Sequence, residues 1–345
     1  MTPERFRAVT SRYAALRVVV VGDVCLDRYL EIDPARAEMS IETGLPVHNV
    51  VNVRAQPGGA GTILNNLVAL GVGTILPVGF CGDDGEGYEL RRGLSAMPGV
   101  RLDHFVTSAD RRTFTYCKPL VIEVGRPPVE LNRLDSKNWT PTPLTLEARL
   151  IDGLHAAADG ADAVIVLEQV DRADTGVVTH GLLSALGALA KARPALPILA
   201  DSRRGLSDWP GVSFKMNAAE LAALLGRKGT PEFDEIRSTA SELATRHGRP
   251  VFVTLSEHGI VGAEPGRPAE YVPALPLRGP IDIVGAGDAV TANLAAALAA
   301  GARLREALDL ASVASSIVIH QLGTTGTASV AQLAGLLAVT VGESK

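Results

Sequence analysis

The sequence contains few cysteines, few aromatic residues and no excess of positive charge. Its three cysteines, Cys25, Cys81 and Cys117, are far apart, and none belongs to a CxxC pair. This spacing argues against a disulfide framework and a clustered zinc site, and it is typical of reduced thiols. Lys and Arg number 33 against 38 Asp and Glu, a formal net charge of −5. No basic surface for nucleic acid or anionic lipid is therefore expected.

Long apolar runs are also missing. The first apolar stretch, residues 18–21, is too short for a secretory signal, and no run reaches the roughly 18 residues that a membrane helix needs. We therefore expect a soluble, cytoplasmic protein with no membrane or nucleic-acid partner. Aromatic residues make up only 4% of a chain that is 46% hydrophobic, so the interior is expected to consist mainly of Ala, Val, Leu and Gly.

Short apolar runs alternate with helical patterns along most of the 345 residues. Runs at 18–21, 163–167, 197–201 and 251–255 predict buried strands, and helical patterns occur at 4–16, 181–192 and 238–246. Continuous apolar strands are typical of a parallel sheet that is covered on both faces. The alternation therefore predicts a βαβ architecture.

Two stretches, about 28–57 and 105–135, interrupt this pattern. They lack helical periodicity and contain short β-like segments at 47–53, 112–117 and 129–134. We expect these stretches to form a small β-structure that projects from the main sheet. No Ser/Gly-rich linker divides the chain.

The segment Asp282-Ile283-Val284-Gly285-Ala286-Gly287-Asp288 leads directly into a predicted helix. Its small residues let the backbone approach a ligand, and the free N–H groups of the helix start point toward that ligand with the positive end of the helix dipole. An aspartate beside such an anion hole can accept a proton from a hydroxyl while the amides stabilise charge on a phosphoryl group. From these residues alone, helix capping by Asp288 is an equal alternative.

This segment resembles the C-terminal signature D-x-x-G-A-G-D of the ribokinase-like, or PfkB-type, carbohydrate kinases. Further segments resemble motifs of that family and follow in its order: Gly22–Tyr29, Pro57–Gly61 continuing to Asn66 and Gly71, Asn217-Ala218-Ala219-Glu220, and Val253–Gly259. The resemblance implies an α/β fold of the ribokinase-like three-layer αβα type, with a mostly parallel central sheet and a small β lid. It also implies a single kinase domain over 1–345, in which 28–57 and 105–135 form the lid.

Within the family, the motifs are most similar to those of the D-glycero-D-manno-heptose-7-phosphate kinases. This similarity rests on Gly22–Tyr29, Asn132–Asp135, Ser256–Gly259 and Leu322–Thr325. Those kinases are often fused to a nucleotidyltransferase domain with an HxGH motif. No HxGH motif occurs here, so we expect the kinase domain alone.

The resemblance implies a role for each matching residue. Asp288 is the expected general base, and the amides of Gly285, Ala286 and Gly287 form the expected anion hole. The expected substrate-binding residues are Asp27, Gly58, Gly59, Asn66 and Arg133, and the expected nucleotide-binding residues are Asn217, Glu220, Thr254, Ser256, Gly259 and Ser312. Asn217 and Glu220 are also expected to organise Mg²⁺ through water, although their spacing equally fits a capping box. Asp282, Gly323 and Thr327 would hold a monovalent cation such as K⁺.

The predicted function is transfer of the γ-phosphoryl group from Mg²⁺–ATP to a hydroxyl of a sugar or sugar phosphate, with a heptose-7-phosphate-like acceptor favoured. Arginine binds phosphate bidentately, so the candidates for a phosphate on the acceptor are Arg28, Arg111, Arg112, Lys118 and Arg133. Exposed strand edges in the lid predict a homodimer formed through the lid. Two alternatives stay open: a kinase for another acceptor such as ribose, fructose or a nucleoside, and a sensor that binds sugar or nucleotide without turnover.

The chain departs from the family pattern at three places. Thr62 and Ile63 stand where the N-terminal signature normally has Asn, and residues 167–170 read Leu-Glu-Gln-Val where heptose kinases have Ser-Asp-Tyr. Ser312 occupies a position near the adenine that is usually Asn. No G-x-G-x-x-G follows the first strand and no Walker A loop occurs, so a dinucleotide oxidoreductase is not expected. The departures leave the identity of the acceptor open.

Overall fold

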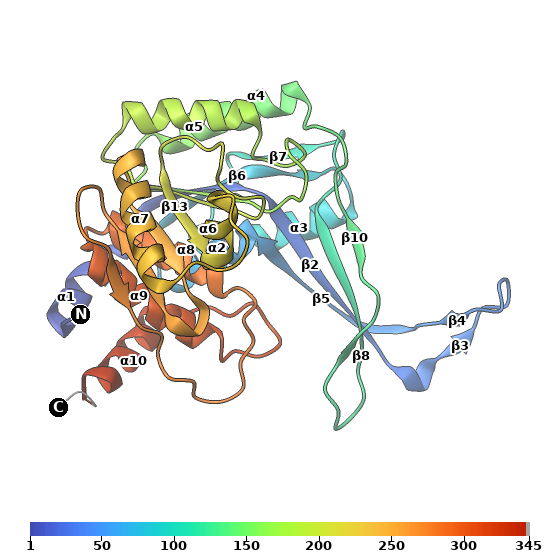
Figure 1. Ribbon diagram of the computed structural model, residues 1–345. Helices are drawn as coiled ribbons and strands as arrows, with labels where there is room; N and C mark the ends of the chain where they lie inside the picture. The colour runs from blue at the N-terminus through green and yellow to red at the C-terminus, as the bar shows by residue number, and fades with distance from the viewer. Residues whose placement is uncertain (343–345) are drawn as a thin grey trace.

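The computed structural model describes the backbone of residues 1–342 and the side chains of residues 1–337; residues 343–345 of the predicted domain lie outside the described part. A nine-stranded sheet forms its centre, in the order β16-β15-β14-β13-β12-β11-β1-β6-β7 (Figure 1). Every neighbouring pair from β14 to β7 is parallel, whereas β15 pairs antiparallel with β14 on one side and with β16 on the other. The strands are β1 (Arg17–Gly22), β6 (Thr74–Gly82), β7 (Phe105–Ser108), β11 (Ala163–Glu168), β12 (Ile198–Ser202), β13 (Ser213–Asn217), β14 (Val251–Thr254), β15 (Ile260–Ala263) and β16 (Glu270–Val272).

Helices cover both faces of this sheet, as the three-layer prediction requires. One face packs against α1 (Pro3–Thr10), α2 (Ala60–Ala69), α3 (Gly85–Ser95), α8 (Ala286–Ala299), α9 (Leu304–Val318) and α10 (Val330–Gly342). The other face packs against α4 (Leu144–Ala158), α5 (His180–Ala192), α6 (Ala218–Leu224) and α7 (Phe233–His247). Strand β1 shows why the apolar runs are continuous, because Val18 and Val20 point into the first core while Val19 and Val21 point into the second.

The elements predicted from apolar periodicity are present. Strands β1 and β11 cover the predicted runs 18–21 and 163–167, β12 and β14 cover 197–201 and 251–255 except for one end residue each, and α5 and α7 cover two predicted helices. The predicted helix at 4–16 is shorter, since α1 ends at Thr10 and a separate 3₁₀ turn follows at Tyr13–Ala15. Among the helices of the described residues, none combines the length and hydropathy that a membrane crossing requires.

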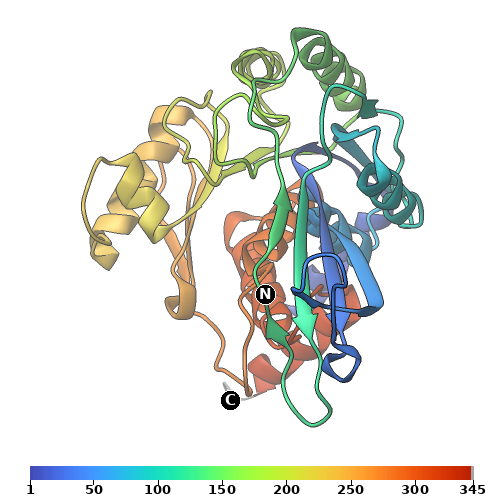
Figure 2. The ribbon, with the colours of Figure 1, turned by 90° about the vertical axis from the view of Figure 1, so that its right-hand side faces the viewer.

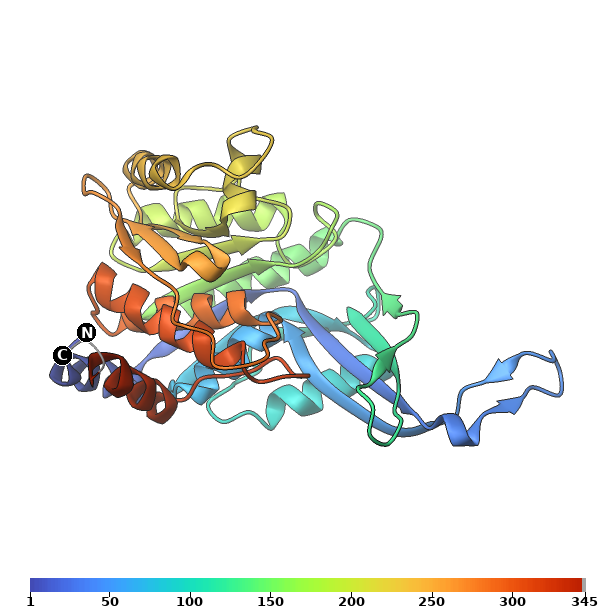
Figure 3. The same ribbon diagram turned by 60° about the horizontal axis from the view of Figure 1, so that its bottom comes forward.

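A second sheet, the lid, projects from one end of the central sheet. Its strand order is β10-β8-β2-β5, with β9 paired to β8, and Figure 2 shows β2, β5 and β8 side by side. The lid strands are β2 (Val24–Ile32), β5 (Val50–Gly59), β8 (Thr115–Val121), β9 (Val129–Glu130) and β10 (Leu134–Ser136). Between β2 and β5, the short strands β3 (Glu38–Met39) and β4 (Pro46–Val47) form an arm that extends beyond the lid (Figure 3).

One part of the predicted lid belongs to the central sheet. Residues Phe105–Ser108 form β7, which pairs in parallel with β6 at the sheet edge, so the predicted lid segment 105–135 is corrected at its start. Burial explains the difference, because Phe105 and Val106 both pack into the cores of the central sheet. The first lid strand also begins earlier than predicted, at Val24, since β2 follows β1 after the single residue Asp23.

Asp23 fixes the junction between the central sheet and the lid. Its carboxylate accepts hydrogen bonds from the backbone N–H groups of Gln169 (2.8 Å), Val170 (3.3 Å) and Val177 (2.7 Å). Burial raises the pKa of Asp23 to about 6, while the three amides favour the charged form. The loop after β11 is therefore tied to the point where the lid begins.

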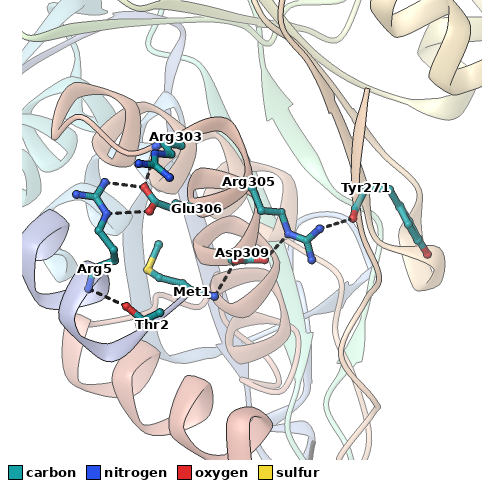
Figure 4. A network of polar contacts seen from close by, with 8 residues as sticks. All are labelled: Met1, Thr2, Arg5, Tyr271, Arg303, Arg305, Glu306 and Asp309. Carbon is teal, nitrogen blue, oxygen red and sulfur yellow. Dashed lines mark hydrogen bonds and ion pairs between the residues drawn. The ribbon is translucent and has the colours of Figure 1, made fainter. Parts of the chain in front are cut away.

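Polar contacts hold α1 against α9 (Figure 4). The Arg5 guanidinium donates two hydrogen bonds to the Glu306 carboxylate, at 2.8 and 2.7 Å, and the Met1 amino group lies 3.0 Å from Asp309. Glu306 also accepts the Arg303 N–H at the start of α9, and these donors, Arg5 first, lower its pKa to about 2. Because α1 also contacts α10, these helices lie together on the side away from the lid (Figures 1 and 3).

Candidate active site

A cavity of about 380 Å³ opens between the lid and the start of α8. Most of its walls are polar, and they come from segments far apart in the sequence. The lid and the residues just after it contribute Asp27, Gly59, Tyr116, Lys118, Arg133, Asp135 and Lys137. The opposite wall contains Thr62, Gln169, Asp171, Arg203, Val284, Gly285, Asp288 and Thr325. The cavity thus combines predicted substrate-binding residues with the predicted catalytic segment.

The start of α8 presents free amides at this cavity. Gly285 is the N-cap with φ of 81°, a conformation that glycine adopts at little cost, and α8 begins at the next residue. The Ala286 N–H donates to the Ile283 carbonyl at 3.2 Å. It is therefore not a free donor, and the prediction that it belongs to the anion hole is corrected. Within the described residues, the N–H groups of Gly285, Gly287 and Asp288 have no backbone acceptor outside the helix. These amides, with the positive end of the helix dipole, form a suitable binding place for an anion in the cavity.

Asp288 lies in the first turn of α8, and it lines the cavity. Burial first, and then the charges of Asp201 and Asp27, raise the pKa of its carboxyl to about 7, although the charge of Lys215 opposes them. A carboxyl group with a pKa near 7 is matched to proton transfer at neutral pH. A purely structural helix cap would not need such an environment, so the electrostatics favour a chemical role for Asp288.

A buried ion pair lies beside Asp288. The Lys215 Nζ is 2.6 Å from Asp201 Oδ2, and the Thr291 hydroxyl lies 3.4 Å from the same oxygen. Burial lowers the pKa of Lys215, but the attraction of Asp201, Asp288 and Glu220 outweighs it, so the pKa is raised and the ammonium stays charged. No sequence motif pointed to Lys215. The signal available was its position two residues before Asn217 in a strand, which places both side chains on one face.

Asp27 occupies the lid side of the cavity. Its side chain is only 8% exposed, and burial raises the pKa of its carboxyl despite the nearby charges of Lys118 and Arg133. A Cβ atom on Gly58 would overlap Asp27 Oδ2, so glycine at this position leaves the space that the carboxylate fills. Gly59 lines the cavity with φ of 56°, whereas Gly58 acts indirectly through Asp27.

Basic side chains surround the rest of the cavity and pair with carboxylates. Lys137 lies 2.6 Å from Asp171, and Arg203 lies 4.0 Å from the other oxygen of the same carboxylate. Arg133 lies 3.1 Å from Asp135 on the lid. These pairs are partly exposed, so each contributes little to stability and can exchange its partner for a charged ligand.

The five predicted phosphate-binding side chains separate into two groups. Lys118 and Arg133 line the cavity, as expected. Arg28 and Arg112 form ion pairs elsewhere in the structure, and Arg111 is buried and donates to backbone carbonyls. Lys137 and Arg203 are the other basic side chains that line the cavity. No motif in the sequence pointed to Lys137.

Asn217 and Glu220 form the capping box that was the open alternative. The Asn217 Oδ1 accepts the Glu220 N–H at 2.9 Å, and Glu220 Oε2 accepts the Asn217 N–H at 2.7 Å. Burial raises the pKa of Glu220. Within residues 1–337, no group of three or more His, Cys, Asp or Glu side chains is arranged to hold a metal ion. One carboxylate with a neighbouring amide fits a Mg²⁺ ion that keeps most of its water and takes further ligands from phosphates.

The predicted nucleotide-binding residues lie outside the wall of the cavity. Thr254 ends β14 directly beside Asn217 of β13, and Ser256 follows with φ of 52°. Gly259 has φ of 105°, and a Cβ there would overlap the Val272 carbonyl, so the turn requires glycine. Ser312 is buried in α9, and its hydroxyl lies 3.4 Å from the Pro273 carbonyl.

Asn66 does not reach the cavity. Its side chain is fully buried in α2, and its Nδ2 donates to the Thr62 carbonyl at 3.0 Å. The prediction that Asn66 contacts substrate is therefore corrected, because the residue faces the interior of the molecule. Thr62, one of the departures from the family pattern, lines the cavity instead.

Two of the three predicted cation-binding residues lie together. The Asp282 carboxylate accepts the Val284 N–H at 3.0 Å and the Gly323 N–H at 3.3 Å. Thr327 is held separately, since its backbone exchanges hydrogen bonds of 2.7 and 3.1 Å with the side-chain amide of Gln321. Asp282 therefore stabilises the turn that leads to Gly285, independently of any cation.

A three-layer fold with a β lid and an aspartate at a glycine-rich helix start is the architecture of a sugar kinase. The sequence profile described as "pfkB family carbohydrate kinase" matches residues 15–331, and the chain therefore belongs to the pfkB family of carbohydrate kinases. This confirms the family that the motifs predicted. The chain is thus a sugar kinase.

Curated relatives include proteins named bifunctional protein HldE. That of Azorhizobium caulinodans is 32% identical over 310 residues, which cover 89% of this chain and 61% of the relative. That of Pseudomonas fluorescens (strain SBW25) is 33% identical over 315 residues, which cover 91% of this chain and 62% of the relative. The chain thus spans about three fifths of the length of these relatives.

Solved structures show the same fold at lower identity. Ribokinase of Arabidopsis thaliana, complexed with ribose and ATP, has a TM-score of 0.66 at 18% identity and covers 93% of this chain and 98% of its own. Phosphofructokinase-2 of Escherichia coli, in complex with potassium, has a TM-score of 0.71 at 19% identity and covers 94% of this chain and 99% of its own. These likenesses confirm the predicted ribokinase-like fold.

The environment of Asp288 predicts a measurable pKa. In the folded protein the carboxyl should titrate at about 7, well above the usual 3.8, because burial and the charge of Asp201 disfavour its ionised form. Carboxyl carbon NMR of ¹³C-labelled aspartate measures this value, with the signal assigned by its loss in Asp288→Asn. The exposed Asp208 is the internal reference. A pKa near 4 for Asp288 would show that the carboxyl is solvated and that the cavity does not favour a base.

Proposed function

We propose that the chain transfers the γ-phosphoryl group of Mg²⁺–ATP to a hydroxyl of a sugar phosphate, with Asp288 as the general base. The observation that carries this proposal is the position of Asp288 between the free amides of the α8 start and the cavity that holds Asp27. A base with a raised pKa beside an anion-binding helix start supplies both requirements of phosphoryl transfer: proton removal and charge stabilisation.

In the proposed reaction, Asp27 accepts hydrogen bonds from sugar hydroxyls and orients the acceptor toward Asp288. Asp288 takes the proton of the attacking hydroxyl, and the N–H groups of Gly285 and Gly287 bind the transferring phosphoryl group. Mg²⁺, when bound, neutralises phosphate charge, and Asn217 and Glu220 would hold its water ligands. Closure of the lid over the acceptor would exclude water that otherwise hydrolyses ATP.

We further propose that the acceptor already bears a phosphate, and that it resembles heptose 7-phosphate. Four basic side chains around the cavity support this: Lys118, Arg133, Lys137 and Arg203. Arg133 pairs with Asp135, and Lys137 and Arg203 pair with Asp171; both carboxylates are partly exposed, so a phosphate can replace them. The similarity of the motifs to heptose-7-phosphate kinases also supports a phosphorylated acceptor. The HldE relatives are named bifunctional, which is compatible with a match to one part of their length.

A monovalent cation completes the proposed site. Asp282 and Gly323 would hold it beside the helix start, with backbone carbonyls as further ligands, and Thr327 would join them only if its backbone leaves Gln321. The hydrogen bonds from Val284 and Gly323 to Asp282 keep this turn in place. One structural neighbour is described in complex with potassium, which makes K⁺ the ion to test.

Replacing the base gives the direct test of the reaction. Asp288→Asn should lower kcat by about 10²–10⁴-fold, because the amide cannot accept the hydroxyl proton. The assay measures ADP release from Mg²⁺–ATP with a panel that includes heptose 7-phosphate, unphosphorylated heptose, ribose, fructose, fructose 6-phosphate and a nucleoside. Asp208→Asn, an exposed site that does not line the cavity, is the matched control.

Each result of this panel has a distinct meaning. Turnover that requires a phosphorylated acceptor and is lost in Asp288→Asn supports the whole proposal. Turnover on an unphosphorylated sugar would overturn the acceptor class but leave the kinase mechanism intact. Equal rates in the wild type and in Asp288→Asn would exclude Asp288 as the base, and the absence of acceptor-dependent ADP would favour the sensor alternative.

The position of Gly58 predicts a selective defect. Gly58→Ala introduces a Cβ into the space of the Asp27 carboxylate, so the carboxylate must move away from the acceptor. We expect kcat/KM for the acceptor to fall about 10- to 100-fold, equivalent to the roughly 1.5–3 kcal/mol of hydrogen bonds to a charged group, with KM for ATP unchanged. Gly85→Ala is the control, since nothing lies within 4 Å of its added Cβ. A parallel loss of ATP affinity would contradict the assignment of Asp27 to the acceptor.

The lid also supports a proposed homodimer. Strand β5 lies at the edge of the lid sheet, and Val50, Val51 and Val53 on it are exposed together with Met39 and Ile41 on the adjacent arm. Pairing of two lids would cover these residues. Sedimentation velocity should therefore give twice the chain mass of 36.0 kDa, and Val51→Lys with Val53→Lys should return the monomer. A wild-type monomer at micromolar concentration would refute this assembly.

A further inference from the structure

Lys215 carries a charge in the interior of the central sheet. The residue is 6% exposed, and its neighbours in β13, Phe214 and Met216, are buried and apolar. An ammonium group in such surroundings persists only if charged or polar partners replace its water. Asp201 supplies one such partner at 2.6 Å.

One carboxylate does not use the full binding capacity of this ammonium. A lysine side chain has three N–H donors. Across the described side chains, Asp201 Oδ2 is the one acceptor within hydrogen-bond distance of Lys215 Nζ. Within the described residues, its other two donors therefore have no protein acceptor.

The ammonium also lies against the start of α8. A Cβ on Gly287 would be only 3.1 Å from Lys215 Nζ, so glycine as the third residue of the Gly285-Ala286-Gly287-Asp288 segment lets the ammonium lie directly against the start of α8. The N-terminus of α8 is itself a positive pole. A buried cation beside a positive pole is an unfavourable arrangement on its own, and an anion bound between them would reverse the sign of the interaction.

Resting on the proposed kinase function, we propose that Lys215 is a catalytic residue whose ammonium binds the terminal phosphate of the nucleotide and stabilises it during transfer. In that step the acceptor oxygen bonds to the γ-phosphorus, its proton passes to Asp288, and the bond from phosphorus to the bridging oxygen of ADP breaks. Lys215 keeps its proton throughout, because Asp201 holds it in the charged form. Its role is to add a full positive charge to the partial charges of the amides.

Variants can separate this role from that of a structural ion pair. Lys215→Met alone leaves Asp201 buried without its partner, which destabilises the fold. The double variant Asp201→Asn with Lys215→Met removes both charges and is the fold-preserving version, and Asp201→Asn alone reports the effect of the carboxylate. Lys191→Met, an exposed lysine on α5, is the matched control. Circular dichroism and thermal melting establish folding for each protein before assay.

The binding readout compares two nucleotides that differ in the terminal phosphate. Isothermal titration with Mg²⁺ and either ADP or the non-hydrolysable β,γ-imido analogue of ATP gives the ratio of the two affinities. In the Lys215 variants this ratio should shift against the ATP analogue by about tenfold or more, and kcat should fall by about 10²-fold, as for loss of one group that stabilises a developing charge. Lys191→Met should retain the wild-type ratio, and Asp201→Asn, which keeps the ammonium but removes the group that holds it, should shift the ratio less than the Lys215 variants do.

A second measurement observes the wild-type protein itself and uses the variants only to assign the signal. The ¹⁵N signal of the Lys215 ammonium, assigned by its loss in Lys215→Met or in the double variant, should shift when Mg²⁺ and the ATP analogue are added. ADP should shift it less, since ADP lacks the terminal phosphate.

The outcomes distinguish this proposal from the proposed function. A folded double variant with the wild-type affinity ratio and kcat within threefold of Asp201→Asn would show that Lys215 serves only the ion pair. An ammonium signal that responds equally to ADP and to the ATP analogue would also overturn the contact. If the wild-type chain binds neither nucleotide, the kinase proposal fails and this role fails with it. Normal wild-type turnover with unaffected Lys215 variants overturns the role of Lys215 alone.

Discussion

The burial of one ammonium group among three carboxylates is the interaction on which the candidate site depends. Lys215 is the middle residue of β13, Asp201 lies one residue before the end of the neighbouring parallel strand β12, and α8 brings Asp288 toward them. Parallel strands end together at one edge of a sheet, which is where ligands bind in open α/β folds. A slip of one residue in β13 would turn Lys215 to the opposite face and leave both Asp201 and Asp288 without a compensating charge.

Glycines position these charges by leaving space for them. Gly58 gives room to the Asp27 carboxylate, and Gly287 gives room to the Lys215 ammonium. Gly285 has a different function, since its positive φ turns the chain so that α8 starts at the cavity. The glycine motifs of this family therefore have a direct physical meaning here: side chains on other strands occupy the volume that a Cβ would take.

The lid joins this edge to the acceptor side of the cavity. Asp23 binds the loop after β11 at the start of the lid, and that loop carries Gln169 and Asp171 into the cavity wall. This is also where the chain departs from the heptose-kinase pattern, at residues 167–170. The segment around Asp288 thus matches the family motif, whereas residues 167–170 depart from it. In the proposed mechanism, substrate preference and catalysis therefore depend on separate segments that meet across the cavity.

The sheet architecture and the family of this protein could be predicted from the sequence. Continuous apolar runs predicted the parallel sheet, because burial on both faces leaves no polar position, and the motif around Asp288 identified the kinase family. Local pattern could not show that Lys215 lies against Gly287, that Lys137 faces Asp171, that Ala286 is engaged in a turn, or that Asn66 points into the core. It also assigned 105–108 to the lid, although that segment pairs with β6. Periodicity and turn chemistry act over a few residues, whereas the order of the strands decides which distant side chains meet, and only the folded chain contains that order.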